Sequence, residues 1–282
     1  MATITQIFKS YIECVNEERW HDLPEVVSFP HKINKGVVDS PQVFADRFAS
    51  IARLHLEVDA TTADEKTQRL GATITVNVYA LGNPESKTTE REQILVWAKD
   101  GKIYQVATLT EKEDPRGQGE DTEHDGSPQP DLIATYTAQT TPTDESKKLS
   151  RTELEDTYRA YIGCINTQAM TTELPRFCHA HVVHNARRLS LEDYGGLIQE
   201  AFTAVPDIVF GIDTVVPDER AQRIAVRLEF TGTPTGTMAG AEPTGKSVRF
   251  YEYVTYAFRD GKIDRVWSIV DWDSYRQQLS QT

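Results

Sequence analysis

The chain contains one stretch of sequence written twice, about 150 residues apart. Seven residues near the N-terminus recur in the same order and at the same spacing. They are Ile4, Phe8, Tyr11, Ile12, Cys14, Val15 and Asn16, which return as Leu154, Tyr158, Tyr161, Ile162, Cys164, Ile165 and Asn166. The apolar members are spaced as one face of an α-helix. A repeat of this length predicts two domains of one fold, and 282 residues suffice for both.

The correspondence continues to the end of each copy. Residues 40–48 match 190–198 as a second capped helix, and residues 72–79 match 224–231 as a strand. Asp100-Gly101 and Asp260-Gly261 supply the turn of a final hairpin in each copy. Helices followed by strands indicate an α+β fold. We therefore expect two tandem cone-shaped α+β barrels, each with N-terminal helices packed on a curved, mostly antiparallel sheet.

The segment between the copies has a different composition. Residues 112–150 contain nine acidic and four basic residues, four prolines and three glycines. Such a segment buries too little apolar area to offset its ordering entropy. The predicted organisation is a first domain over residues 1–111, an acidic linker over 112–150 and a second domain over 151–282.

Charge and cysteine usage narrow the class of protein. A net charge of −13 argues against binding nucleic acid or anionic membranes, whose phosphates repel it. No run approaches the roughly 20 apolar residues that span a bilayer, and the N-terminus lacks a secretory pattern. Cys14, Cys164 and Cys178 form no C-x-x-C pair, so a reducing compartment, the cytoplasm, is expected.

The second copy, over about residues 153–280, resembles the SnoaL-like polyketide cyclases of the nuclear transport factor 2-like superfamily. The segments that carry the resemblance, in order, are 184–194, 204–208, 224–227, 230–236, 243–246, 258–263 and 266–271. The first copy keeps the frame but lacks most of them. The resemblance implies a conical fold with one pocket per domain, dimerisation through the outer sheet face, and cofactor-free acid–base catalysis by a buried Asp or His.

Two residues are the expected catalytic groups. The resemblance aligns Asp271 with the family's acidic position at the end of the last strand, where an apolar interior favours proton exchange near neutral pH. The alternative is a carboxylate that caps the segment from Trp272 or pairs with Arg265. His184 and Asn185 match the family's His-Asn pair, so His184 is expected to act as a base or orient an enolate oxygen. A structural histidine is the alternative.

Further residues are expected to contact substrate. Arg227 polarises a carbonyl if its strand face points inward, and belongs to a surface or interface if it points outward. Glu252 and Tyr253 point to opposite faces, and Tyr253 stands where many relatives carry His. Trp267 is expected to be a pocket wall, and Asn185 is expected to bind substrate. No metal is expected, because the histidines of residues 179–184 do not share one face and no carboxylate completes a site.

These residues lead to a predicted function with two alternatives. The resemblance favours a cofactor-independent cyclase or isomerase that acts on an apolar, polyketide- or terpenoid-like intermediate. A hydratase or epoxide hydrolase, and a ligand-binding or scaffold protein without catalysis, remain open. In the first copy Ile33, Thr75, Ala107 and Glu111 replace His184, Arg227, Trp267 and Asp271. We therefore expect the first domain to be a structural partner that pairs with the second within the chain, with a further homodimer possible.

Overall fold

The computed structural model of the protein describes residues 2–48, 51–81, 83–111, 144–185 and 187–280. It divides into two compact units, Met1–Lys112 and Glu113–Thr282. Most of the predicted linker, residues 112–143, lies outside the described residues. The elements of the first unit are α1 (Ile4–Asn16), α2 (Leu23–Val26), β1 (Val27–Ile33), β2 (Gly36–Val38), α3 (Pro41–Asp46), β3 (Ile51–Asp64), β4 (Arg69–Ala80), β5 (Asn83–Lys99) and β6 (Lys102–Thr110).

The second unit repeats this order and adds a helix at its end. Its elements are the 3₁₀ turn η3 (Glu145–Lys147), α5 (Arg151–Asn166), α6 (Met170–Phe177), β7 (Cys178–His184), β8 (Arg187–Ser190), α7 (Leu191–Ala204), β9 (Val209–Asp218), β10 (Arg223–Gly232), β11 (Val248–Arg259), β12 (Lys262–Val270) and α8 (Trp272–Ser280).

The two sheets have the same topology. The described strands form two six-stranded sheets, in the orders β2-β1-β6-β5-β4-β3 and β8-β7-β12-β11-β10-β9. In each, one pair is parallel, β1 with β6 or β7 with β12, and the other pairs are antiparallel. The predicted tandem α+β fold is therefore confirmed. The sheets are open and not closed barrels, because their first and last strands do not pair.

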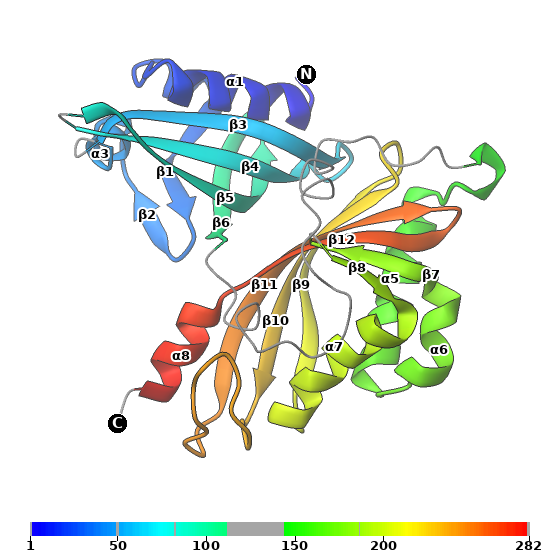
Figure 1. Ribbon diagram of the computed structural model, residues 1–282. Coiled ribbons are helices and arrows are strands. Elements are labelled where there is room, and N and C mark those ends of the chain that lie inside the picture. The colour runs from blue at the N-terminus through cyan, green and yellow to red at the C-terminus, as the bar shows by residue number, and fades with distance from the viewer. Residues whose placement is uncertain (1, 49–50, 82, 112–143, 186, 281–282) are drawn as a thin grey trace. The chain divides into compact units, whose positions relative to one another are not determined.

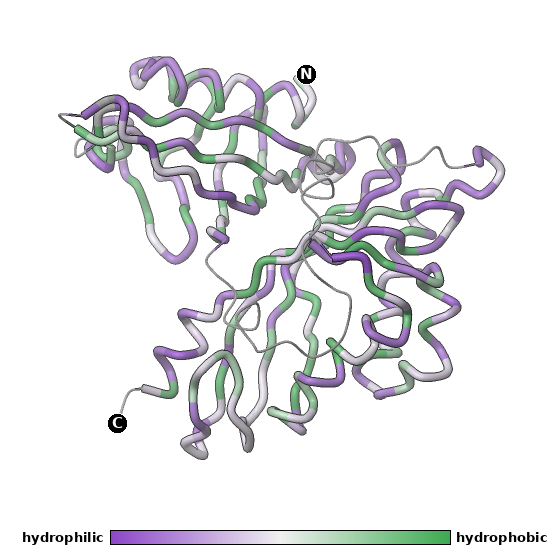
Figure 2. Tube along the Cα trace, viewed as in Figure 1, coloured by the Kyte–Doolittle hydropathy of each residue, from purple (hydrophilic) through white to green (hydrophobic). Residues whose placement is uncertain are grey.

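The first helix of each unit forms as the repeat predicts. Thr3 with Gln6, and Ser150 with Glu153, form complete capping boxes that satisfy free backbone N–H groups. At the other end, Asn16 and Asn166 each bond both to the N–H and to the C=O of one strand residue, Leu56 and Phe210, at 2.7–3.0 Å. The repeated Asn thus ties the helix to its sheet. Hydrophobic and hydrophilic positions alternate along α1 in Figure 2.

In the second unit the helices cover one face of the sheet. α5 packs on β9 and β10, α6 on α5 and α7, and α7 on β7 and β8 (Figure 1). α8 follows β12 and packs against β11. Side chains from these helices and from the inner sheet face form one apolar core, which includes Leu154, Tyr158, Val254 and Phe258. Among the described residues, no helix is both long and apolar enough to cross a membrane.

Cross-strand pairing fixes which strand residues face this core. Leu228, Glu252 and Val270 lie side by side across β10, β11 and β12, and Arg227, Tyr253 and Ile269 form the neighbouring row. Because side chains alternate along a strand, the two rows point to opposite faces. The first row faces the helices and the second faces away from them.

Candidate active site

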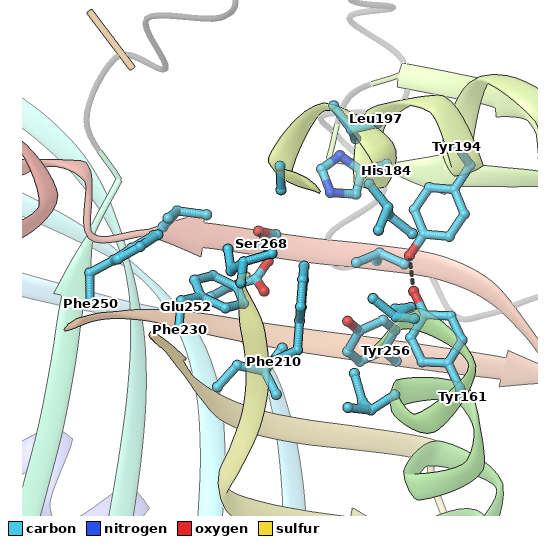
Figure 3. A pocket seen from close by; sticks show the side chains of 18 of the residues that line it. Tyr161, His184, Tyr194, Leu197, Phe210, Phe230, Phe250, Glu252, Tyr256 and Ser268 are labelled. Atoms are coloured by element: carbon cyan, nitrogen blue, oxygen red, sulfur yellow. Dashed lines mark hydrogen bonds between the residues drawn. The ribbon is translucent and has the colours of Figure 1, made fainter. Parts of the chain in front are cut away.

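A cavity of about 90 Å³ lies between the helices and the sheet of the second unit. Its walls come from α5, α7, the inner faces of β9–β12, and the start of α8. Four residues from successive turns of α7 line the cavity: Tyr194, Leu197, Ile198 and Ala201. Figure 3 shows that Tyr161, Tyr194 and Tyr256 lie on one side and that Phe210, Phe230 and Phe250 lie on the other, with Glu252 and Ser268 beside the phenylalanines. The cavity is therefore apolar with a few polar groups in its wall.

Glu252 supplies the carboxylate of the cavity. It stands on the inner face of β11 and accepts a hydrogen bond from the Ser268 hydroxyl on β12. Ser268 is itself fixed by Asn185, whose side chain accepts from the Ser268 N–H at 2.8 Å and donates to its C=O at 3.1 Å. Asn185 adopts φ 51°, a left-handed conformation in which Asn is among the few favoured residues. The end of β7 is thereby attached to β12 beside Glu252.

His184 precedes Asn185 and also lines the cavity. Its ring lies 6.0 Å, centroid to centroid, from that of Tyr194. The hydroxyl groups of Tyr194 and Tyr161 are 2.7 Å apart, and Tyr256 stands beside them with its ring centroid 5.8 Å from that of Tyr161. Burial raises the pKa of all three phenols well above the ordinary 10.0. They therefore remain protonated near neutral pH, as hydrogen-bond donors.

Asp271 lies outside the residues that line the cavity. Its carboxylate accepts bonds from the Ser274 N–H at 3.0 Å and from the Ser274 hydroxyl at 2.6 Å, while its C=O accepts from the Tyr275 N–H. These are the contacts of a residue that caps the N-terminus of α8. The contacts of Asp271 with Ser274 and Tyr275 therefore fit the alternative in which its carboxylate caps the segment from Trp272. The catalytic role of Asp271 stays a prediction that the geometry does not support.

Three predicted substrate contacts lie on the other face of the sheet. Arg227 donates to Asp213 at 2.7 Å and stacks 5.1 Å above the ring of Tyr251. Tyr253 stands in the same cross-strand row as Arg227 and shares a hydrogen bond with it. Trp267 is 4% exposed and packs with Ala257, apart from the main core. None of the three is among the lining residues, so a direct role in the cavity stays a prediction without structural support.

The structure thus brings together two of the seven predicted residues, His184 and Glu252, and uses Asn185 to hold them in place. Sequence reasoning missed Ser268, Tyr161, Tyr194 and Tyr256. The two helical tyrosines belong to apolar stripes that are typical of core packing, so only the pairing of α5 with α7 reveals their contact. Within the described residues, no cluster of three His, Cys, Asp or Glu side chains is placed to hold a metal ion.

Comparisons with known proteins match the second unit. The family description "SnoaL-like polyketide cyclase" matches residues 155–279. A SnoaL-like polyketide cyclase structure from Agrobacterium tumefaciens is 37% identical over 45% of this chain and 98% of its own, with a TM-score of 0.42. AclR from Streptomyces galilaeus is 20% identical over 47% of this chain and 88% of its own, with a TM-score of 0.41. TsrD from Streptomyces laurentii is 18% identical over 48% of this chain and 99% of its own, with a TM-score of 0.43.

Sequence similarity decides the family. A search of curated proteins finds no match. The family match covers residues 155–279 of the second unit, and the Agrobacterium protein is aligned at 37% identity over almost its full length. Through its second unit, the chain belongs to the SnoaL-like polyketide cyclase family.

Proposed function

We propose that the second unit catalyses cyclisation or isomerisation of an enolisable carbonyl compound by acid–base chemistry, without a cofactor. The observation that carries this proposal is the Glu252 carboxylate, held by Ser268 on the wall of a mostly apolar cavity that His184 also lines. Family membership supports the reaction class.

The proton transfer follows from the position of the two groups. Glu252 takes a proton from the carbon next to the substrate carbonyl, and the C–H electron pair moves into the enolate. The enolate then attacks a second carbonyl, which closes a ring, or accepts a proton at another carbon, which isomerises the substrate. His184, protonated at the start, delivers the proton that the new alkoxide or carbon centre requires and becomes neutral, and the proton held by Glu252 then passes to His184, which restores the carboxylate and the imidazolium.

The cavity limits what part of a substrate is enclosed. Pockets for drug-sized ligands measure about 300–1,000 Å³, and an apolar cavity of about 150 Å³ holds a benzene. At about 90 Å³ the present cavity encloses only the reacting end of an apolar intermediate. A polyketide- or terpenoid-like substrate therefore requires α7 or α8 to move outward, or leaves its body outside the mouth.

The hydratase alternative receives no support from the arrangement of charged groups. An acid–arginine pair does form between Asp213 and Arg227, but it lies on the sheet face that points away from the cavity. Ligand binding without turnover is the outcome that the experiment below separates from catalysis.

The test is exchange of the α-protons of cyclopentanone in D₂O, followed by ¹H NMR at millimolar ketone. The full chain is expected to speed the exchange, and Glu252→Gln is expected to lower the enzymatic rate by about 10²–10⁴-fold, the typical contribution of a general base. Glu229→Gln is the matched control, because Glu229 lies on the outer face and accepts a bond from Tyr251 at 2.9 Å. Exchange that Glu252→Gln leaves unchanged overturns the proposal. Asp271→Asn in the same assay tests the catalytic role that the sequence predicts for Asp271.

The pairing of the two units also remains a proposal. Each sheet carries apolar side chains on the face turned away from its own helices: Leu95, Trp97 and Ala107 in the first unit, and Ala257, Trp267 and Ile269 in the second. Apolar area of this kind is stable when another surface covers it. We propose that sheet-to-sheet pairing provides the cover. A Trp267→Glu chain that keeps the wild-type melting temperature argues against it.

A further inference from the structure

The hydroxyl groups of Tyr161 and Tyr194 form a hydrogen-bonded pair in the wall of the cavity. Tyr161 comes from α5 and Tyr194 from α7, and the two oxygens are 2.7 Å apart (Figure 3). Both side chains are almost fully buried, at 1% and 3% exposure. Both also line the cavity that Glu252 and His184 share.

A count of hydrogens shows that this pair has a donor left over. Two phenol groups carry two O–H hydrogens, and a bond between them uses one. Among the described residues, neither hydroxyl has another hydrogen-bond partner. A buried donor without an acceptor is unfavourable, so a site of this kind favours a ligand that brings an oxygen.

The pair also remains protonated under the conditions of the reaction. Burial is the largest cause that raises the pKa of both phenols, and for Tyr194 the Glu252 carboxylate adds to it. The phenols therefore donate hydrogen bonds and do not compete with Glu252 as bases. A neutral donor chain in which one hydroxyl polarises the next is a stronger donor than a single hydroxyl.

We propose that the Tyr161–Tyr194 pair binds the carbonyl oxygen of the substrate and stabilises the enolate oxygen that forms on it. This inference rests on the function proposed above, and it assigns the substrate's orientation. The carbonyl points to the α5–α7 side, the acidic C–H points to Glu252, and the apolar body points to Phe210, Phe230 and Phe250. As the C–H electron pair moves to oxygen, the unused O–H hydrogen shortens its bond to that oxygen, and no covalent bond to the protein forms.

The first unit offers an internal contrast for this pair. Tyr11 and Phe44 stand where the second unit has Tyr161 and Tyr194, and their rings meet edge to face at 6.4 Å. The first unit therefore has one phenol at this place and no second hydroxyl to bond it. Tyr194→Phe reproduces that arrangement in the second unit.

The test reads the carbonyl bond directly. Infrared difference spectra of ¹³C=O-labelled cyclopentanone are recorded on the full chain carrying Glu252→Gln, in which bound ketone is not enolised. Donation from the pair is expected to shift the bound carbonyl band to lower frequency than in water-free solvent. Adding Tyr194→Phe or Tyr161→Phe is expected to move the band back upward. Tyr158→Phe is the control, since Tyr158 lies on α5 but not in the cavity wall.

The outcomes separate this inference from the proposed function. In the wild-type background, Tyr194→Phe is also expected to slow α-proton exchange by about 10²-fold, the usual effect of losing one oxyanion donor. A carbonyl band that neither tyrosine variant moves overturns the inference, even when exchange proceeds. A band that both variants move, together with a chain that never exchanges protons, supports the oxygen site and refutes only the proposed catalysis.

Discussion

The two units share a frame and differ in what they place on it. Their strands follow the same order, and an Asn in the left-handed conformation, Asn34 or Asn185, ends the first strand of each sheet and bonds the last. Each has an inward Glu on the same strand, Glu92 or Glu252, that accepts from a hydroxyl on the next. Both units contain the left-handed Asn and the inward Glu with its hydroxyl partner. These features are therefore parts of the shared fold.

The two units differ in the helix that covers the sheet, here called the roof helix (α3 in the first unit and α7 in the second). They also differ in the residues beside the inward Glu. α7 has 14 residues and α3 has six, so α3 covers less of its sheet. Glu92 accepts from two hydroxyls, Thr108 at 2.5 Å and Thr110 at 2.9 Å, whereas Val270 replaces the second donor beside Glu252. A cavity of about 200 Å³ in the first unit lies against α3 and β3, and Glu92 is not among its lining residues. We therefore expect the chemistry proposed for the second unit to depend on its longer roof helix.

The largest expected effect comes from exchanging His184 for its counterpart in the first unit. His184→Ile, which copies Ile33, is expected to lower α-proton exchange by about 10²-fold or more, because the proton that His184 supplies is lost. Circular dichroism checks that the chain still folds. The reverse change, Ile33→His, is the matched control and is expected to add no exchange. Full activity in His184→Ile would show that the histidine is structural.

The second prediction concerns acid, and it separates the units by stability. His31 is fully buried, and burial lowers its pKa from 6.5 to about 4. Between those pH values the unfolded chain binds a proton that the folded unit does not. The stability due to neutral His31 is complete above pH 6.5 and is lost as the pH falls to about 4, by about 3 kcal/mol at most.

Hydrogen–deuterium exchange mass spectrometry at pH 7 and pH 4.5 reads this loss separately in peptides from residues 2–111 and 144–280. Protection of the first unit is expected to fall more in acid than that of the second. The variant His31→Val copies Val182, the buried residue at the same place in the second unit, and is expected to remove the difference. Equal acid sensitivity in His31→Val and wild type contradicts the prediction.

The third prediction concerns Asn34 and Asn185, whose side chains bond backbone groups of β6 and β12. Gly tolerates the left-handed backbone, so Asn185→Gly and Asn34→Gly remove side-chain bonds without forcing a new conformation. Each change is expected to cost about 1–3 kcal/mol of stability, because a backbone group of the last strand loses its partner. Only Asn185→Gly is expected to lower α-proton exchange, since it releases Ser268 and the adjoining His184. Calorimetry and the NMR assay measure the two effects.

The sequence alone predicts the frame well, for physical reasons. The helical stripe, the capping boxes and the Asp-Gly turns are local patterns, and all form as expected. The face of each strand was harder to assign. β12 carries apolar residues on both sides, Val266 and Val270 facing the core and Trp267 and Ile269 facing away, so alternation does not tell which side holds the cavity.

Local sequence patterns do not predict which residues line the cavity, because the cavity forms between segments that are far apart in the sequence. Tyr161 and Tyr194 are 33 residues apart and read as core positions of separate helices. Asp271 carries a local alternative, since an Asp just before a helical segment is a favoured N-cap residue. The resemblance to a catalytic position outweighed that local signal, and the contacts with Ser274 favour the local signal.

The smallest expected effect tests whether the roof helix must yield for substrate to enter. Gly195 and Gly196 lie inside α7, between Tyr194 and Leu197, which line the cavity, and two glycines weaken a helix interior. A Cβ at Gly196 meets no atom within 4 Å, so packing does not require glycine there. Gly196→Ala is therefore expected to stabilise the second unit by about 0.5–1 kcal/mol, seen as a slightly higher melting temperature.

The consequence for function follows from the size of the cavity. If α7 moves to admit a larger ketone, Gly196→Ala stiffens that motion and is expected to slow exchange of a bicyclic ketone such as 1-decalone more than that of cyclopentanone. Gly195→Ala is a comparison of known strain, because its Cβ would stand 3.3 Å from the Leu174 side chain. An equal effect on both ketones would mean that α7 is a fixed wall, and that the larger substrate reacts with its body outside.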